Sequence, residues 1–294
     1  MAVRELGLYR TSILRIVFFY FLVVLLFRFI HYQLPFQLQN PPLFIANFDL
    51  AFWFFNYFGL KDILYQNYIG GLVFSVLLVV FNVLSIIYTK NRWFIGIFAI
   101  LFFIYALGYN IYLTHSSHTF SGVILLPFCF LFFKKSNFEL LWEGYRYYVC
   151  WIYLSAFLMK VYFGAFFQYN FGELTFKENI AWIIYQDPEN WRSVASSFFI
   201  RNPILLIIGY YIMIPLEGLF GIGFFTKKMD KIFLLLIPFI HIVFYFFIDV
   251  LFFEQMLLSI LFISTTQWKR INHFIKSPKA LLNFFINVKK ILVS

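Results

Sequence analysis

Long runs of hydrophobic residues dominate the chain. Seven of them approach the roughly 20 apolar residues that a helix needs to cross a bilayer. These runs are residues 13–32, 69–88, 93–113, 119–133, 147–166, 203–225 and 232–252. The pattern therefore predicts an all-α, polytopic integral membrane bundle of about seven to eight transmembrane segments.

Two shorter runs have a less regular pattern. Residues 255–266 follow an acidic side chain directly, and we expect them either to span thinly or to re-enter the membrane. Residues 44–60 are interrupted by polar side chains. A full span there would put the basic loops near residues 90 and 134 on opposite sides of the membrane, so we expect an interfacial or re-entrant helix.

Composition supports the membrane assignment and excludes other classes. Of the 294 residues, 63% are hydrophobic, 25% aromatic and only 12% charged. Soluble proteins carry about 25% charged residues, and disordered chains have few aromatic ones. The two cysteines, Cys129 and Cys150, lie in apolar runs. We expect them to be buried small hydrophobes rather than a disulfide.

The net charge of +10 indicates topology rather than nucleic-acid binding. Most lysines and arginines fall in alternate loops, and cytoplasmic loops are the ones enriched in these residues. This bias predicts that both termini are cytoplasmic. The first run ends in Arg28 and His31 with no small-residue cleavage site, so we expect an uncleaved signal anchor.

Two segments outside the spans are predicted to be amphipathic. Residues 167–202 mix aromatic and charged side chains and should form helices on the outer surface, either as a plain cap or as a lid over an intramembrane cavity. Residues 267–294 form a basic tail, which we expect on the anionic inner leaflet. The predicted domains are therefore a transmembrane domain, 1–266, and a cytoplasmic tail, 267–294. Gly221 and Gly223 suggest close helix packing.

Lys160 is the sharpest candidate for function, because an ionisable side chain inside the membrane is costly and is a functional hypothesis by default. It lies in an apolar run, in the outer half of its predicted span. It could snorkel to the interface, or it could sit in a desolvated pocket as a general base. The small residues Ser155, Ala156 and Gly164 would let a helix or a flat ligand approach.

His115 and His118 open the fourth run on the same predicted side as Lys160. They could be an interfacial helix cap, or a proton donor or hydrogen-bond partner for a substrate oxygen. A metal site is disfavoured because the sequence offers no obvious third ligand. Glu217 and His241 have matching predicted depths and are expected to form a hydrogen bond between two spans. The aromatic residues could also line a cavity for a flat apolar ligand such as a quinone.

Two short motifs resemble the vitamin K-dependent γ-glutamyl carboxylase family and its bacterial relatives, the horizontally transferred transmembrane domain proteins. Tyr153-Leu-Ser-Ala-Phe-Leu-Met-Lys160 resembles the family's Tyr-x-x-Ala-Gly-x-x-Lys helix, with Phe157 in place of the glycine. Ser117-His118-Thr-Phe resembles its Asn-His-x-Tyr opening of the preceding helix. The order and the spacing of the two motifs also agree.

The resemblance implies a bacterial inner-membrane enzyme in which Lys160 deprotonates a reduced, vitamin K-like quinone and His118 assists it. His115, Tyr153 and Gly164 would then lie at the cofactor site. The chemistry would be of the carboxylase/lyase type or a quinone-linked oxidoreduction, acting on the cofactor or on an exported peptide.

The alternative is a non-catalytic membrane subunit or partner protein in the maturation or export of a secreted peptide. We expect no counterpart of the family's large lumenal domain, and some bacterial relatives serve toxin maturation. A haem or transport protein using histidines is a third hypothesis, disfavoured because His31, His118 and His241 are predicted at different depths.

Overall fold

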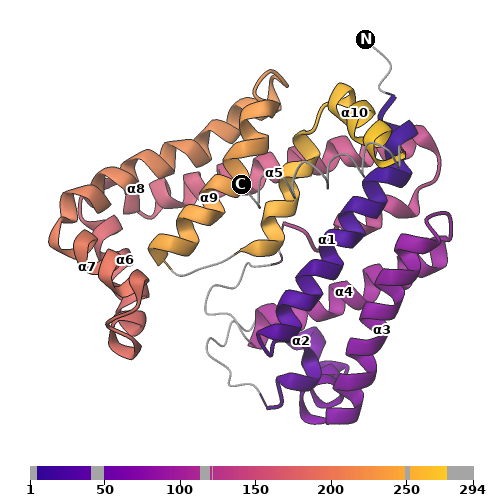
Figure 1. Ribbon diagram of the computed structural model, residues 1–294, viewed down its shortest axis with the longest axis horizontal. Helices are drawn as coiled ribbons and strands as arrows, with labels where there is room; N and C mark the ends of the chain where they lie inside the picture. The colour runs from indigo at the N-terminus through magenta and orange to yellow at the C-terminus, as the bar shows by residue number, and fades with distance from the viewer. Residues whose placement is uncertain (1–4, 41–49, 113–119, 121, 249–251, 277–294) are drawn as a thin grey trace, which may run out of the picture. The chain divides into compact units, whose positions relative to one another are not determined.

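The computed structural model describes residues 5–40, 50–112, 120, 122–248 and 252–276, and these residues form helices and turns without any β-strand. The chain divides into two compact units (Figure 1). Unit 1 comprises Met1–Trp142 and Ile263–Ser294, and unit 2 comprises Glu143–Phe262. The boundary falls inside the long helix α5, Lys135–Tyr162.

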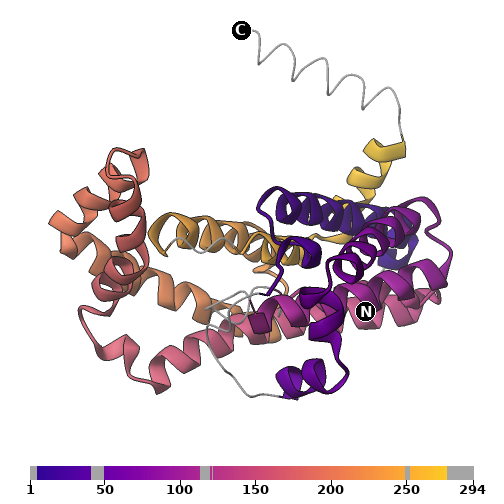
Figure 2. The same cartoon turned by 90° about the horizontal axis from the view of Figure 1, so that it is seen from below.

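Unit 1 is built around three long apolar helices that pack together (Figures 1 and 2). They are α1 (Arg10–Ile30), α3 (Tyr68–Ile87) and α4 (Arg92–Tyr112). The shorter elements are η1 (Glu5–Tyr9), η2 (Pro35–Gln37), α2 (Leu50–Tyr57), the π-helical turn η3 (Asp62–Gln66), η4 (Leu126–Leu131) and α10 (Thr265–Lys276). The Asn67 side chain caps α3 by accepting a hydrogen bond from the Gly70 amide at 3.1 Å.

The core of unit 1 is largely aromatic. Phe18 and Phe21 of α1 pack against Phe98 and Phe102 of α4, with ring centroids 4.6 to 5.8 Å apart. All four rings are fully buried. Aromatic pairs at these separations contribute beyond the area they bury, so the many phenylalanines of these helices serve packing as well as lipid contact.

Unit 2 contains the rest of α5 and a second set of helices. These are η5 (Ala165–Phe167), α6 (Phe171–Gln186), α7 (Trp191–Arg201), α8 (Pro203–Gly218), η6 (Leu219–Phe224), α9 (Asp230–Ile248) and η7 (Phe253–Phe262). Helix α6 packs against both α8 and α9. The predicted amphipathic segment 167–202 is therefore helical, as two helices with the chain turning at Asp187–Asn190.

Glycines bring α5 close to the end of α8 and to η6. A Cβ atom on Gly218 would lie 3.3 Å from the Phe157 ring, and one on Gly223 would lie 2.6 Å from the Cys150 sulfur. The close packing predicted for Gly221 and Gly223 is confirmed. Phe157, which stands where the carboxylase motif has a glycine, packs against Gly218 at the end of α8. Cys129 and Cys150 are both free and buried, as expected.

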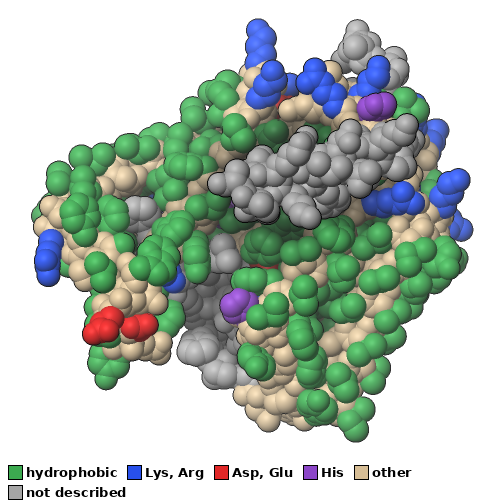
Figure 3. Space-filling view, viewed as in Figure 1, with side chains coloured by type: hydrophobic (Ala, Val, Ile, Leu, Met, Phe, Trp, Pro, Cys, Tyr) green, Lys and Arg blue, Asp and Glu red, His purple; other side chains and the backbone are tan. Residues whose placement is uncertain are grey.

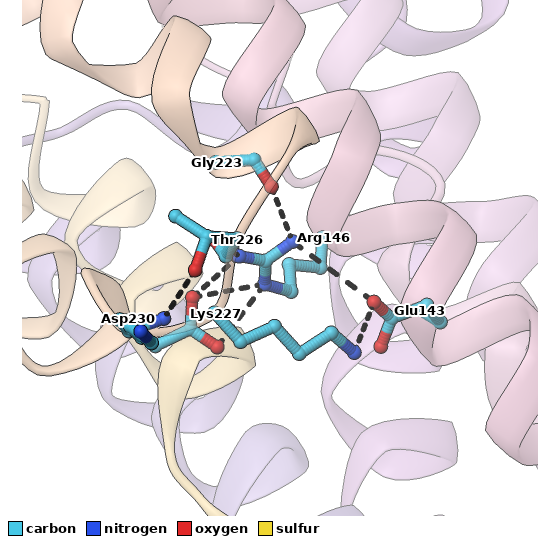
Figure 4. Close-up of polar contacts among 7 residues, drawn as sticks. Glu143, Arg146, Gly223, Thr226, Lys227 and Asp230 are labelled. Atoms are coloured by element: carbon cyan, nitrogen blue, oxygen red, sulfur yellow. Dashed lines mark hydrogen bonds and ion pairs between the residues drawn. The ribbon is translucent and has the colours of Figure 1, made fainter. Parts of the chain in front are cut away.

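Arg146 holds the turn between η6 and α9 (Figure 4). Its guanidinium donates to both carboxylate oxygens of Asp230, at 2.5 to 3.2 Å, and to the carbonyls of Gly223 at 2.9 Å and Thr226 at 3.3 Å. Glu143 lies 3.9 Å away and also pairs with Lys227. A planar guanidinium can bind the Asp230 carboxylate and the two carbonyl oxygens at once, because its donors form a rigid fork.

Four helical segments of the described residues are long and apolar enough to cross a membrane. They are Leu6–Gln37, Tyr68–Ile87, Arg92–Ile111 and Pro203–Phe224. Helix α5 also covers residues 147–162 of the run 147–166, and α9 covers residues 232–248 of the run 232–252. The described part of run 119–133 differs from the prediction, because it forms turns and the short η4 rather than a spanning helix. Pro127 stands at the start of η4, where its lack of an amide donor disfavours a continuous α-helix, although α8 and α9 accommodate Pro215 and Pro238 in their interiors.

The described part of run 44–60 is the eight-residue helix α2, too short to cross a bilayer.

Several basic segments of unit 1 meet at one end. Arg10 donates to the carbonyl of Thr89 at 3.4 Å and to that of Phe132 at 3.2 Å, and Ser12 donates to Asn272 of α10 at 2.6 Å. Figure 3 shows Lys and Arg side chains gathered at this α10 end, with hydrophobic side chains along the flank of the unit.

Candidate functional site

Unit 2 contains an apolar cavity of about 270 Å³. Its walls come from the C-terminal half of α5, the first turns of α6, the middle of α8, the end of α9 and the residue before η7. The lining side chains and glycines include Lys160, Phe171, Gly172, Thr175, Phe176, Leu206, Gly209, Tyr210, Met213, Val243, Phe244 and Phe252. Among these residues Lys160 is the one that carries a charge. The cavity can therefore hold a largely apolar group with one polar end.

Lys160 forms an ion pair with Glu217 of α8. The Glu217 side chain is only 4% exposed, whereas that of Lys160 is 30% exposed. The carboxylate is thus the enclosed partner, and the amine lies at the cavity wall. Each group supplies the counter-charge that the other needs in an apolar setting, which reduces the cost of burying both.

Tyr153 and His241 form a second polar pair beside the first. The Tyr153 hydroxyl and His241 Nε2 share a hydrogen bond of 2.7 Å. Both side chains are buried, and the Tyr153 ring stacks on Phe220 at 4.3 Å between centroids. Tyr153 lies two helical turns before Lys160, on the same face of α5. The Glu217 carboxylate is close enough to act electrostatically on Tyr153.

The predicted hydrogen bond between Glu217 and His241 is therefore wrong. The structure pairs Glu217 with Lys160 and His241 with Tyr153, so both partners come from α5. Equal depth in the membrane was the basis of the prediction. Depth alone does not determine the direction in which each helix turns its side chains, and here both residues turn toward side chains of α5.

Tyr210 adds a hydroxyl to the same wall. Its oxygen is buried and has no hydrogen-bond partner among the described residues, although the residue lines the cavity. Glu217 also acts electrostatically on Tyr210, which lies two turns earlier on α8. A buried hydroxyl without a partner is unfavourable, so a hydrogen bond from a polar atom at this wall would be stabilising.

Two glycines have opposite roles in the cavity. A Cβ atom on Gly172 of α6 would lie 2.5 Å from the Tyr210 Cβ atom, so this glycine allows α6 and α8 to approach each other. A Cβ atom on Gly209 would meet nothing within 4 Å, so this glycine leaves space in the wall. Gly209 has no side chain and therefore leaves the space of the cavity open. Gly172 has no side chain and therefore lets α6 lie close enough to cover the cavity.

This arrangement can exchange a proton with a ligand. The shared proton of the ion pair can rest on Lys160 Nζ or on the Glu217 carboxylate, and only the first position faces the cavity. The Tyr210 hydroxyl could orient a ligand oxygen near the amine. The apolar walls would exclude water, which strengthens each of these electrostatic contacts.

The predicted site residues have different outcomes. Lys160 is at the cavity, and Tyr153 is in the polar pair beside it. Gly164 does not line the cavity; it has a φ of 75° and ends α5 in the left-handed conformation that glycine adopts readily. His115 and His118 lie outside the described residues.

Glu217 as the partner of Lys160, and Tyr210 as a lining residue, were not predicted. A signal existed for Glu217, since it is the lone acidic residue of its run and Lys160 the lone basic residue of another. No comparable signal marks Tyr210 among 20 tyrosines. Comparison of the chain with family models, with curated proteins and with solved structures gives no match.

Proposed function

We propose that the protein is an integral membrane enzyme of the carboxylase-like type, whose cavity in unit 2 binds the ring of a reduced quinone. Both termini would lie in the cytoplasm of a bacterial inner membrane. The observation that supports the proposal most is the Lys160–Glu217 pair at the wall of an otherwise apolar cavity.

The lining residues fit such a ring. A volume of about 270 Å³ lies just below the usual range of ligand pockets, which suits one flat ring system rather than a folded peptide. Phe171, Phe176 and Phe244 supply aromatic surface, and Lys160 and Tyr210 supply two polar contacts. A bound reduced quinone would supply an ionisable ring hydroxyl.

Lys160 and Glu217 would act together on that hydroxyl. In the apolar wall the shared proton moves from Lys160 Nζ to Glu217, which leaves a neutral amine facing the cavity. The neutral amine would be the base for the ring hydroxyl of the ligand, and the resulting ammonium would balance the charge of the negative oxygen. Charge is conserved, and no isolated ion is left in the apolar site at any stage.

Tyr210 and Tyr153 would assist without exchanging the proton themselves. The Tyr210 hydroxyl would donate to the ligand oxygen and hold it near the amine. The Tyr153–His241 hydrogen bond would fix the α5 helix face that carries Lys160. Helix α6 would cover the cavity and limit water entry, which is the role of a lid that the sequence suggested for residues 167–202.

Menadiol, a soluble reduced naphthoquinone, tests this proposal with the purified full chain. We expect the protein to bind menadiol and to promote its ionisation, which changes its ultraviolet spectrum. Lys160→Met should bind it without that spectral change. Lys177→Met is the matched control, because Lys177 pairs with Glu173 on the exposed side of α6. Equal ionisation by Lys160→Met and wild type would refute Lys160 as the base.

A partner role in peptide maturation is the second candidate, and the surface of α6 and α7 favours it. Trp182, Tyr185 and Trp191 expose half or more of their surface there. Large exposed aromatic side chains mark protein or membrane contact sites. Stoichiometric co-purification of another protein, with no menadiol binding, would support this function over the enzymatic one.

A further inference from the structure

Unit 1 carries a second, separate pocket at the turn between α3 and α4. It is an open hollow of about 740 Å³. Its lining includes Tyr88, Thr89, Lys90, Asn91, Arg92, Trp93 and Phe133. The pocket joins the ends of two helices that are long enough to cross a membrane, Tyr68–Ile87 and Arg92–Ile111, so it lies where the bilayer surface would be.

The pocket is strongly cationic. Lys90 and Arg92 are exposed, and neither forms an ion pair with another described residue. Arg10 lies against two lining residues: it donates to the Thr89 carbonyl, and its guanidinium carbon is 4.3 Å from the centre of the Phe133 ring. Three cations thus lie at one hollow.

Arg10 is the unusual member of this group. It is only 6% exposed, yet its partners in the described part of unit 1 are the carbonyls of Thr89, Phe130 and Phe132, with no carboxylate. Carbonyl oxygens satisfy its donors but leave its charge uncompensated. A buried cation without a counter-ion is costly, so the site favours an anion nearby.

The backbone and the rim add to this preference. Asn91 accepts a hydrogen bond from the Trp93 amide at 3.0 Å at the start of α4, and helix N-termini favour phosphate groups. Tyr88 and Trp93 are 54% and 70% exposed at the rim. Exposed tryptophan and tyrosine at the ends of membrane helices are typical of the headgroup region.

We propose that this pocket binds the phosphate headgroup of an anionic phospholipid, with the acyl chains beside α3 and α4. The positive charge selects an anion, and the exposed aromatic rim and the helix ends select a lipid over free phosphate. The inference is independent of the cavity in unit 2. With the proposed orientation, the lipid belongs to the inner leaflet.

Short-chain lipids test this proposal on the full chain in a neutral detergent. Dioctanoyl phosphatidylglycerol should bind and raise the melting temperature, whereas dioctanoyl phosphatidylcholine should not. The double variant Lys90→Gln/Arg92→Gln should bind phosphatidylglycerol about 30-fold more weakly, from the loss of two surface cations. Lys228→Gln/Lys231→Gln removes the same charge from exposed positions of unit 2 and should bind like wild type.

Three results would overturn the proposal. One is wild-type affinity for phosphatidylglycerol in the Lys90→Gln/Arg92→Gln variant. Another is equal weakening in the Lys228→Gln/Lys231→Gln control, which would indicate general charge attraction. The third is stabilisation by inorganic phosphate equal to that by phosphatidylglycerol, which would make the pocket a site for free phosphate. Circular dichroism of both variants checks that they remain folded.

Discussion

At the scale of single residues, Lys160 and Glu217 show how an apolar wall can hold two charged side chains. Each is costly without the other, above all the enclosed Glu217, because a buried ion loses its hydration without replacement. Together they form a pair whose carboxylate is enclosed and whose amine is accessible from the cavity. The pair is therefore a stabilising contact and a candidate reactive group at the same time.

A double-mutant cycle measures this dependence. Glu217→Gln leaves Lys160 without its counter-charge and should lower the free energy of unfolding by about 1–3 kcal/mol. Lys160→Met alone leaves the enclosed carboxylate unpaired and should also destabilise. The double variant Lys160→Met/Glu217→Gln should be less unstable than the sum of the two, by about 0.5–3 kcal/mol. Additive effects in thermal unfolding would mean that the two side chains are not coupled.

Two glycines of the cavity give a matched pair for the same substitution. Gly209→Ala adds a methyl group in open space and replaces a helix-interior glycine, so it should stabilise α8 by up to about 1 kcal/mol. Gly172→Ala adds the same group against the Tyr210 Cβ atom and should destabilise by about 1–3 kcal/mol. Melting temperatures should therefore move in opposite directions, and a shift of the same sign in both would contradict the geometry.

At the scale of elements, Arg146 explains how a short irregular turn is held between η6 and α9. At this turn the guanidinium donates hydrogen bonds to the carbonyl oxygens of Gly223 and Thr226. Asp230, at the start of α9, balances the charge. One side chain of α5 thus fixes the path by which two helices of unit 2 connect.

Replacement of this guanidinium tests its role. Arg146→Lys keeps the charge but loses the fork, so it should destabilise the protein by about 2–4 kcal/mol. Arg146→Ala should cost at least as much, since it also leaves Asp230 and the carbonyls unpaired. The measurement is thermal unfolding of the purified chain. Lys228→Ala serves as control, because that exposed side chain is outside the cluster, and an equal loss there would argue against a specific role.

At the scale of the whole molecule, the basic segments of unit 1 limit the possible topologies. The N-terminal end of α1, the α3–α4 turn, the segment around Phe132 and helix α10 lie at one end of this unit. Parts of a membrane protein that share one end lie on the same side of the bilayer. In the proposed topology that side is the cytoplasm, because cytoplasmic loops are the ones enriched in lysine and arginine.

Reporter fusions test the orientation. A green fluorescent protein fused after the last residue should fluoresce, because it would remain in the cytoplasm. Alkaline phosphatase fused after Glu189, between α6 and α7, should be active, because it would be exported. The reverse pattern of the two reporters would invert the proposed topology.

The sequence predicted some elements closely and others not at all. Helices α1, α3 and α4 begin and end within a few residues of the predicted runs, because length and hydrophobicity alone determine a helix in a bilayer. Run 119–133 was as hydrophobic, and its proline did not distinguish it, because the helical runs 203–225 and 232–252 also contain prolines. The partners within the site were harder to predict, since the rotation of α8 and α9 about their axes depends on packing against α5.

The two cysteines, Cys129 and Cys150, are buried at 4% and 0% exposure. Thiol reagents need access to a thiolate, so the native chain should react slowly with maleimides. Gly209 faces open space, and Gly209→Cys would place one reachable sulfur in the cavity wall. A spectroscopic label attached there would report solvent, lipid or ligand in the cavity directly, in an otherwise unreactive background.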